Sequence, residues 1–182
     1  MKPSHVTLFT VGALVAVLLP ASPATAGELS AIINGKSYHI NSTYDWNEDN
    51  YGVGAEYVFS TESRWKKSVV ANGFRDSNNK MSYMAGAGLH RRLIESKRLA
   101  GFYFDAGLTA FVMTREDVDN NKPFPGVLPT LSFGNRYAGF SLTYLPRRAV
   151  QKMVDAKIAD PSISGVVFVQ FKVRLSRLST KK

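Results

Sequence analysis

The stretch that decides the fold is residues 99–114, which read LAGFYFDAGLTAFVMT. One parity of this stretch is apolar throughout, while the other mixes glycines with an acid and a hydroxyl. The apolar parity is Ala100, Phe102, Phe104, Ala106, Leu108, Ala110 and Val112. Alternation with a period of two predicts a β-strand, and this run is long for a strand of a globular protein.

The same alternation recurs in residues 51–59, 137–145 and 167–175. Bulky apolar side chains occupy one face of each segment, and glycines, polar or charged residues occupy the other. Strands that are apolar outside and polar inside are typical of membrane β-barrels. A soluble β-sandwich inverts the sense of the two faces and gives the same alternation, so it is the alternative interpretation.

Eight strands are expected along the chain. They lie at residues 30–40, 51–59, 65–73, 81–92, 99–114, 126–133, 137–145 and 164–175. Short connections alternate with longer ones, and outer-membrane barrels combine short periplasmic turns, long external loops and an even number of strands. The predicted fold class is therefore all-β, an eight-stranded antiparallel outer-membrane β-barrel. Aromatic girdles would include Tyr44, Trp46, Tyr51, Trp65 and Tyr144.

The first 26 residues predict a cleaved signal peptide, which leaves a single domain at residues 27–182. Lys2 precedes a largely apolar run at 6–19, and Ala24-Thr25-Ala26 has the form of a cleavage site. Beyond this segment, no apolar run reaches the roughly 18 residues of a transmembrane helix. Export places the protein in the bacterial outer membrane rather than the cytoplasm.

Composition excludes several kinds of site. The chain has no cysteine, so neither a disulfide framework nor a thiolate metal site is expected. Only His39 and His90 follow the leader, which argues against a His-rich zinc site. The net charge of +9 suggests an anionic partner such as lipopolysaccharide, or else ordinary surface charge. Nothing in the sequence suggests nucleic-acid binding.

Strand order brings three polar side chains to one rim. If both chain ends are periplasmic, the loops after the first and third strands lie outside, and these loops begin at His39 and contain Asp76 and Ser77. Such a group can perform general-base chemistry on a hydroxyl. The alternative is that residues 74–80, FRDSNNK, form a polar turn whose side chains bond to nearby backbone.

Four short motifs, in the same order along the chain, resemble those of the lipid A palmitoyltransferase (PagP) family. They are FRDSNNK at 74–80, DAGLTAFVMTR at 105–115, PFPGVLP at 123–129 and LTYLP at 142–146. The resemblance implies an eight-stranded barrel that encloses an acyl cavity. It also implies transfer of a palmitoyl chain from a glycerophospholipid to lipid A, with no metal or soluble cofactor.

The resemblance carries the family's three external residues onto His39, Asp76 and Ser77. His39 would take a proton from the acceptor hydroxyl or from Ser77, and Asp76 would orient the imidazole. Whether Ser77 attacks the ester or only positions the substrates stays open.

Further roles follow from the same resemblance. Gly88 corresponds to a glycine at the cavity floor that sets acyl length, although a strand glycine can also serve close packing. Pro129 and Pro146 match prolines beside gaps that admit lipid sideways. His90 is expected to be an interior or rim polar group.

Cations in the external loops are expected to contact lipid A phosphates, the alternative being a solvated basic rim. They are Arg115, Arg147 and Arg148, with Lys122 and Lys152 beside them. The predicted function is a monomeric lipid A acyltransferase that uses lipopolysaccharide and glycerophospholipid as substrates. Two other classes remain open: a non-enzymatic structural or adhesive barrel, and a lipid A deacylase.

Overall fold

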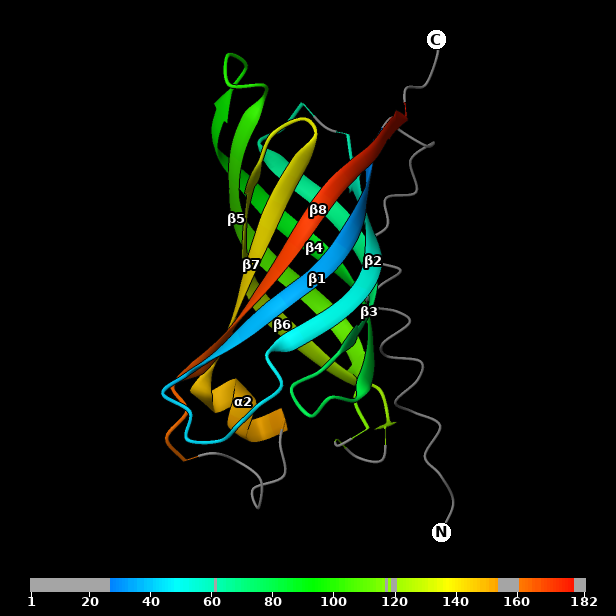
Figure 1. The fold of residues 1–182 in the computed structure, drawn as a ribbon. Helices are drawn as coiled ribbons and strands as arrows, with labels where there is room; N and C mark the ends of the chain where they lie inside the picture. Colours follow the sequence, from blue (N-terminus) through cyan, green and yellow to red (C-terminus); the bar gives the residue numbers. More distant parts are fainter. Residues whose placement is uncertain (1–26, 61, 117, 119–120, 154–160, 179–182) are drawn as a thin grey trace.

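The computed structural model describes residues 27–60, 62–116, 118, 121–153 and 161–178, and their strands close into one antiparallel barrel (Figure 1). The strands are β1 (Gly27–Ile40), β2 (Asp49–Phe59), β3 (Trp65–Arg75), β4 (Met81–Ser96), β5 (Phe102–Thr114), β6 (Phe124–Gly134), β7 (Ala138–Pro146) and β8 (Gly165–Leu178). Each strand pairs with the next along the chain, and β1 also pairs with β8. The predicted eight-stranded barrel is confirmed. The expected signal peptide at 1–26 lies outside the described residues.

A short helix, α2 (Arg147–Met153), follows β7 at one end of the barrel (Figure 1). The longer connections lie at this end, while the short turns lie at the end where Gly27 pairs with Leu178. In the described part of the chain, no helix is long and apolar enough to cross a membrane.

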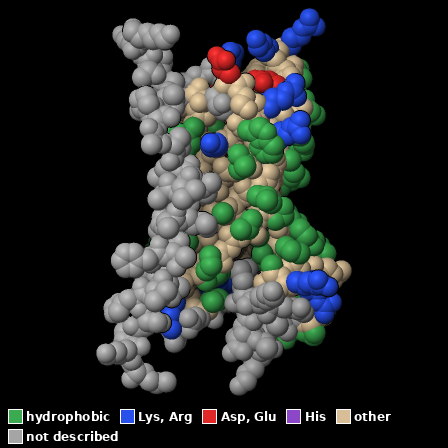
Figure 2. Space-filling view, turned by 180° about the vertical axis from the view of Figure 1, so that it is seen from behind, with side chains coloured by type: hydrophobic (Ala, Val, Ile, Leu, Met, Phe, Trp, Pro, Cys, Tyr) green, Lys and Arg blue, Asp and Glu red, His purple; other side chains and the backbone are tan. Residues whose placement is uncertain are grey.

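The two faces of the barrel differ in polarity. Polar side chains dominate the buried positions, among them Asn34, Asn72 and Gln170, whose amides bond to one another at 2.6–2.9 Å. Large hydrophobic side chains are instead exposed, and Figure 2 shows them over the middle of one face, with most charged side chains toward the ends. A polar interior with an apolar exterior suits a barrel in lipid, and it rules out the sandwich alternative.

Strand boundaries differ modestly from those predicted. β5 begins at Phe102 rather than at residue 99, because Ala100 and Gly101 adopt left-handed φ angles of 52° and 75°. The Phe102 N–H donates to the Leu99 carbonyl at 2.9 Å and so closes a turn. The apolar residues before Phe102 therefore belong to the β4–β5 hairpin.

An irregularity in β1 determines which residues of this strand face inward. Ser30, Ile32 and Asn34 are buried, and so are Ser37 and His39, although the two sets differ in parity. The pairing with β8 shifts between Asn34 and Ser37, where β1 contains one extra residue. This bulge reverses the alternation, and without it His39 would point toward the lipid.

Candidate functional site

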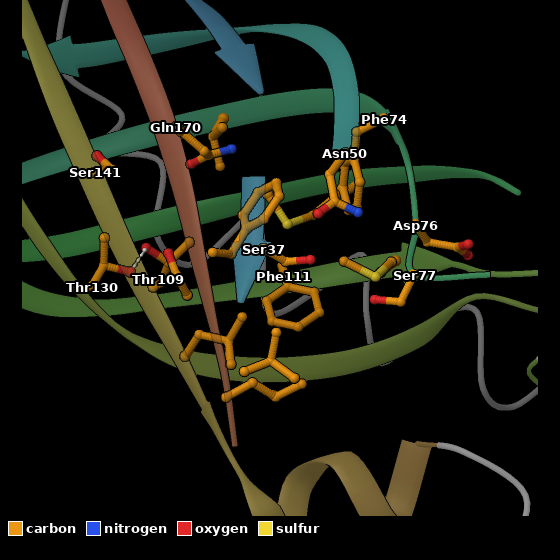
Figure 3. A pocket seen from close by; sticks show the side chains of 18 of the residues that line it. Ser37, Asn50, Phe74, Asp76, Ser77, Thr109, Phe111, Thr130, Ser141 and Gln170 are labelled. Carbon is orange, nitrogen blue, oxygen red and sulfur yellow. Dashed lines mark hydrogen bonds between the residues drawn. The ribbon is translucent and has the colours of Figure 1, made fainter. Parts of the chain in front are cut away.

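A cavity opens at the end of the barrel that carries α2, and side chains from all eight strands line it. The walls near its mouth are largely apolar, with contributions from Phe74, Phe111, Leu128, Val150 and Ile163. Figure 3 shows Asp76 and Ser77 at one end of this space and Thr109, Thr130 and Ser141 toward the other. The cavity can therefore take an alkyl chain whose head lies near Ser77.

His39 and Ser77 meet at the mouth of the cavity, as the sequence predicted for their loops. The His39 Nε2 atom is 2.9 Å from Ser77 Oγ. The imidazole is 4% exposed and stacks on Trp46, with ring centroids 5.5 Å apart and planes 19° apart. Trp46 was predicted for an aromatic girdle, and this is wrong because its indole faces the imidazole inside the rim.

The carboxylate beside the imidazole belongs to Glu48, not to Asp76. Glu48 Oε1 lies 3.4 Å from His39 Nδ1 and accepts a hydrogen bond from the His39 backbone N–H at 3.0 Å. A proton on Nδ1 would face Glu48, which leaves the Nε2 lone pair free to accept the Ser77 hydroxyl proton. This is the arrangement that lets a histidine act as a base toward a serine.

Asp76 instead organises the turn that presents Ser77. Its Oδ1 accepts hydrogen bonds from the backbone N–H groups of Asn78 at 2.9 Å and Lys80 at 3.0 Å. Its Oδ2 accepts from Ser82 Oγ–H at 2.9 Å and lies 3.6 Å from Arg115 Nε. The polar-turn interpretation of residues 74–80 is therefore right for Asp76, while Ser77 next to it reaches His39.

The predicted phosphate-binding arginines divide into two groups. Arg115 is only 13% exposed, lines the cavity and pairs with Asp76, so it lies inside the site rather than on the outer rim. Arg147 and Arg148 are exposed at the start of α2, and Arg147 Nη2 donates to the Pro161 carbonyl at 2.8 Å. The side chain of Lys152 lies outside the described residues.

At the bottom of the cavity, His90 takes the place expected for Gly88. Gly88 is buried, but a Cβ on it would lie 2.6 Å from both the His90 ring and Ser68 Oγ. His90 lines the cavity together with Glu56 and Lys172, which form a buried ion pair at 2.5 Å. The floor is therefore polar and charged, and His90 covers Gly88.

A seam separates β6 from β7 at the end of the barrel that holds the site. Their pairing runs from Gly134–Gly139 to Thr130–Thr143 and stops just before Pro129, whereas β6 stays paired with β5 up to Phe124. Pro146 ends the facing edge of β7 and pairs with Gly165 of β8. The two prolines thus flank the seam.

Comparison with known proteins identifies the family. The family model for the "antimicrobial peptide resistance and lipid A acylation protein PagP" matches residues 28–154. The chain belongs to the PagP family. The matched range spans the positions of His39, Glu48, Asp76, Ser77 and Arg115.

Individual PagP relatives share less than a third of their aligned residues with this chain. The lipid A acyltransferase PagP of Bordetella pertussis is 30% identical over 123 residues, which is 63% of this chain and 64% of the relative. The proteins of the same name from Methylobacillus flagellatus and Erwinia pyrifoliae are 28% identical over 117 residues and 30% identical over 116 residues, each covering 60% of this chain and 61% of the relative. The chain thus spans less than two thirds of the length of the curated relatives it matches.

The residue that sequence reasoning missed is Glu48. It lies in a loop after β1, where no periodicity marks a residue for burial or contact. Its proximity to His39 depends on backbone hydrogen bonds that fold this loop back, among them the one from the Ser37 N–H to the Glu48 carbonyl at 2.9 Å. An acid nine residues after a site histidine was the only available signal.

Proposed function

We propose that this protein is a lipid A acyltransferase of the outer membrane, which moves a palmitoyl chain from a glycerophospholipid to a hydroxyl of lipid A. The observation that carries the proposal is the 2.9 Å contact between Ser77 Oγ and His39 Nε2 at the mouth of a cavity whose walls near the mouth are largely apolar. A membrane barrel gives such a cavity access to both lipid substrates.

In the first half of the reaction, the donor's acyl chain lies in the cavity and its ester carbonyl reaches Ser77. His39 Nε2 accepts the Ser77 proton as Oγ attacks the carbonyl carbon. The C–O bond to the glycerophospholipid then breaks, and the lysophospholipid oxygen takes the proton from His39. The acyl group is left as an ester on Ser77.

In the second half, a lipid A hydroxyl gives its proton to His39 and attacks the acyl-Ser77 carbonyl. The bond to Ser77 breaks, and Oγ recovers the proton from His39. Arg115 lines the cavity, and its positive charge lies near the site, where negative charge develops on the carbonyl oxygen in both halves.

The seam between β6 and β7 supports lateral entry of lipid, because Pro129 and Pro146 flank it. Arg147 and Arg148 beside it suit the phosphates of lipid A. The remaining parts of the proposal are export through a signal peptide at 1–26 and action as a monomer. A closed barrel without a free sheet edge supports the monomer.

Mass spectrometry of lipid A from cells with and without the gene tests the proposal. A gain of one palmitoyl chain is expected, which Ser77→Ala and His39→Ala each reduce about a hundredfold or more. Ser63→Ala, in an exposed short turn, is the matched control and should retain activity. Loss of an acyl chain would favour a deacylase, and unchanged lipid A would favour a structural barrel.

The covalent step has its own test. Purified protein given donor phospholipid without lipid A should gain one palmitoyl group on the peptide that contains Ser77, as measured by mass spectrometry. If transfer to lipid A proceeds while this adduct never forms, the acceptor hydroxyl attacks the donor directly and His39 is its base.

A further inference from the structure

We infer that Glu48 is the positioning residue of this site: it fixes the His39 imidazole for proton transfer, while Asp76 builds the turn that carries Ser77. The inference rests on the proposed acyl transfer. It changes the role expected for Asp76 and adds a residue to the site.

The bonding of Asp76 supports a structural role. The carboxylate is 2% exposed, and its oxygens hold two backbone N–H groups, the Ser82 hydroxyl and Arg115. Three hydrogen bonds use most of the roughly four lone-pair sites of the carboxylate, and the Arg115 guanidinium lies 3.6 Å away as a counter-charge. Asp76 is thus engaged in fixing the loop between β3 and β4.

Glu48 contacts His39 at two points. The same oxygen accepts from the backbone N–H at 3.0 Å and lies 3.4 Å from the ring Nδ1. The Glu48 Oε1 atom therefore holds the imidazole in a fixed orientation relative to the His39 backbone. Trp46 stacks on the ring and limits its rotation.

The loop that carries Glu48 is itself tied to both halves of the site. The Ser37 N–H donates to the Glu48 carbonyl at 2.9 Å. The Asn47 N–H donates to the Ser77 carbonyl at 2.9 Å, and the Asn47 side-chain amide donates to the Asp76 carbonyl at 2.9 Å. The loop before β2 thus holds Glu48, His39 and Ser77 in one hydrogen-bonded unit.

Chemically, Glu48 favours the tautomer with the proton on Nδ1, so that Nε2 stays free to accept from Ser77. It also favours the imidazolium that forms during each half-reaction. The Glu48 side chain is 39% exposed, so solvent weakens the charge effect and orientation is its larger contribution.

Kinetics of the purified protein with donor phospholipid and lipid A give the first test. Glu48→Gln should lower kcat by about tenfold or more, less than the ~10⁴-fold seen when a buried triad carboxylate is changed. KM should stay near its original value, and Glu48→Asp should restore part of kcat. Asp49→Asn is the matched control, because this neighbouring acid is exposed and pairs with Lys36 on the surface.

Nitrogen NMR of the histidine side chains gives a test that is independent of activity, and His90→Gln assigns the signals. The Nδ1–H tautomer of His39 should be present in the original protein and in Asp76→Asn, and reduced in Glu48→Gln. An unchanged tautomer and kcat in Glu48→Gln, or a tautomer lost in Asp76→Asn, would overturn the inference. If no variant transfers acyl groups but the tautomer still follows Glu48, the proposed function fails and the positioning role stands.

Discussion

His90 is the residue on which the depth of the cavity depends. Its ring covers Gly88 and lies beside the Glu56–Lys172 ion pair, and no hydrogen-bond partner for its Nε2 is found among the described residues. A saturated chain gains nothing by displacing a buried ion pair, since separating the two charges is costly. The end of an acyl chain should therefore stop above His90.

A pair of substitutions tests whether His90 or Gly88 limits the length of the acyl chain that the cavity accepts. Gly88→Ala should shorten the transferred acyl group, because the new Cβ would force the His90 ring toward the cavity. In a His90→Ala background, the same change should have little effect, and longer chains should be accepted. Competition among donors of different chain length, read by mass spectrometry, measures this.

Gly73→Ala controls for glycine replacement in a strand, since its Cβ would meet the Tyr83 ring outside the cavity. Equal shortening by Gly88→Ala in both backgrounds would identify Gly88 itself as the floor.

The individual residues show how far sequence reasoning reaches. The convergence of His39 and Ser77 was predictable, because alternating short and long connections place their loops on one rim. The position of Arg115 was not, since a loop cation can turn outward to solvent or inward to Asp76, and only the packed structure decides. Gly88 was correctly expected to face inward, but its cover by His90 depends on a rotamer that no sequence pattern encodes.

Among the strands, β2 and β8 are joined across the inner face of β1 by Glu56 and Lys172, whose side chains are 10% and 11% exposed. Glu56→Gln should lower the free energy of unfolding by about 3 kcal/mol, because it leaves a buried ammonium without its counter-charge. Glu56→Met combined with Lys172→Met should recover most of this loss. Urea titration of the protein in detergent measures both.

The exposed Lys36–Asp49 pair at 2.7 Å provides the comparison, and Asp49→Asn should cost less than about 1 kcal/mol. If Glu56→Gln and Asp49→Asn lower the free energy of unfolding by the same amount, burial does not increase the contribution of the Glu56–Lys172 pair to stability.

At the level of strands, the sequence predicted the number and order but not the bulge in β1. Ile33 and Tyr38 both face outward, although they are five positions apart and would lie on opposite faces of a regular strand, so the alternation reverses between them. The change of parity between these two apolar residues can be seen in the sequence. The position of the extra residue, however, depends on pairing with β8. The bulge decides whether His39 faces the cavity, so the site depends on it.

Across the whole molecule, the seam, α2 and the His39–Ser77 contact all lie at the same end of the barrel (Figure 1). Val150 of α2 and Ile163 before β8 are buried and line the cavity, so this end is partly covered. A lipid that enters through the seam would meet the apolar walls near the mouth before reaching the polar floor. The proposed activity therefore requires this end to lie in the leaflet that contains lipid A.

Single cysteines test this orientation cleanly, because the chain has none of its own. Lys122→Cys, exposed in the connection between β5 and β6, should react on intact cells with a maleimide that cannot cross the outer membrane. Lys97→Cys, exposed in the β4–β5 turn at the opposite end, should react only after the membrane is opened. Both variants replace an exposed lysine, so they match in charge and size. The reverse pattern would place His39 and Ser77 in the periplasm, away from lipid A, and would contradict the proposed acceptor.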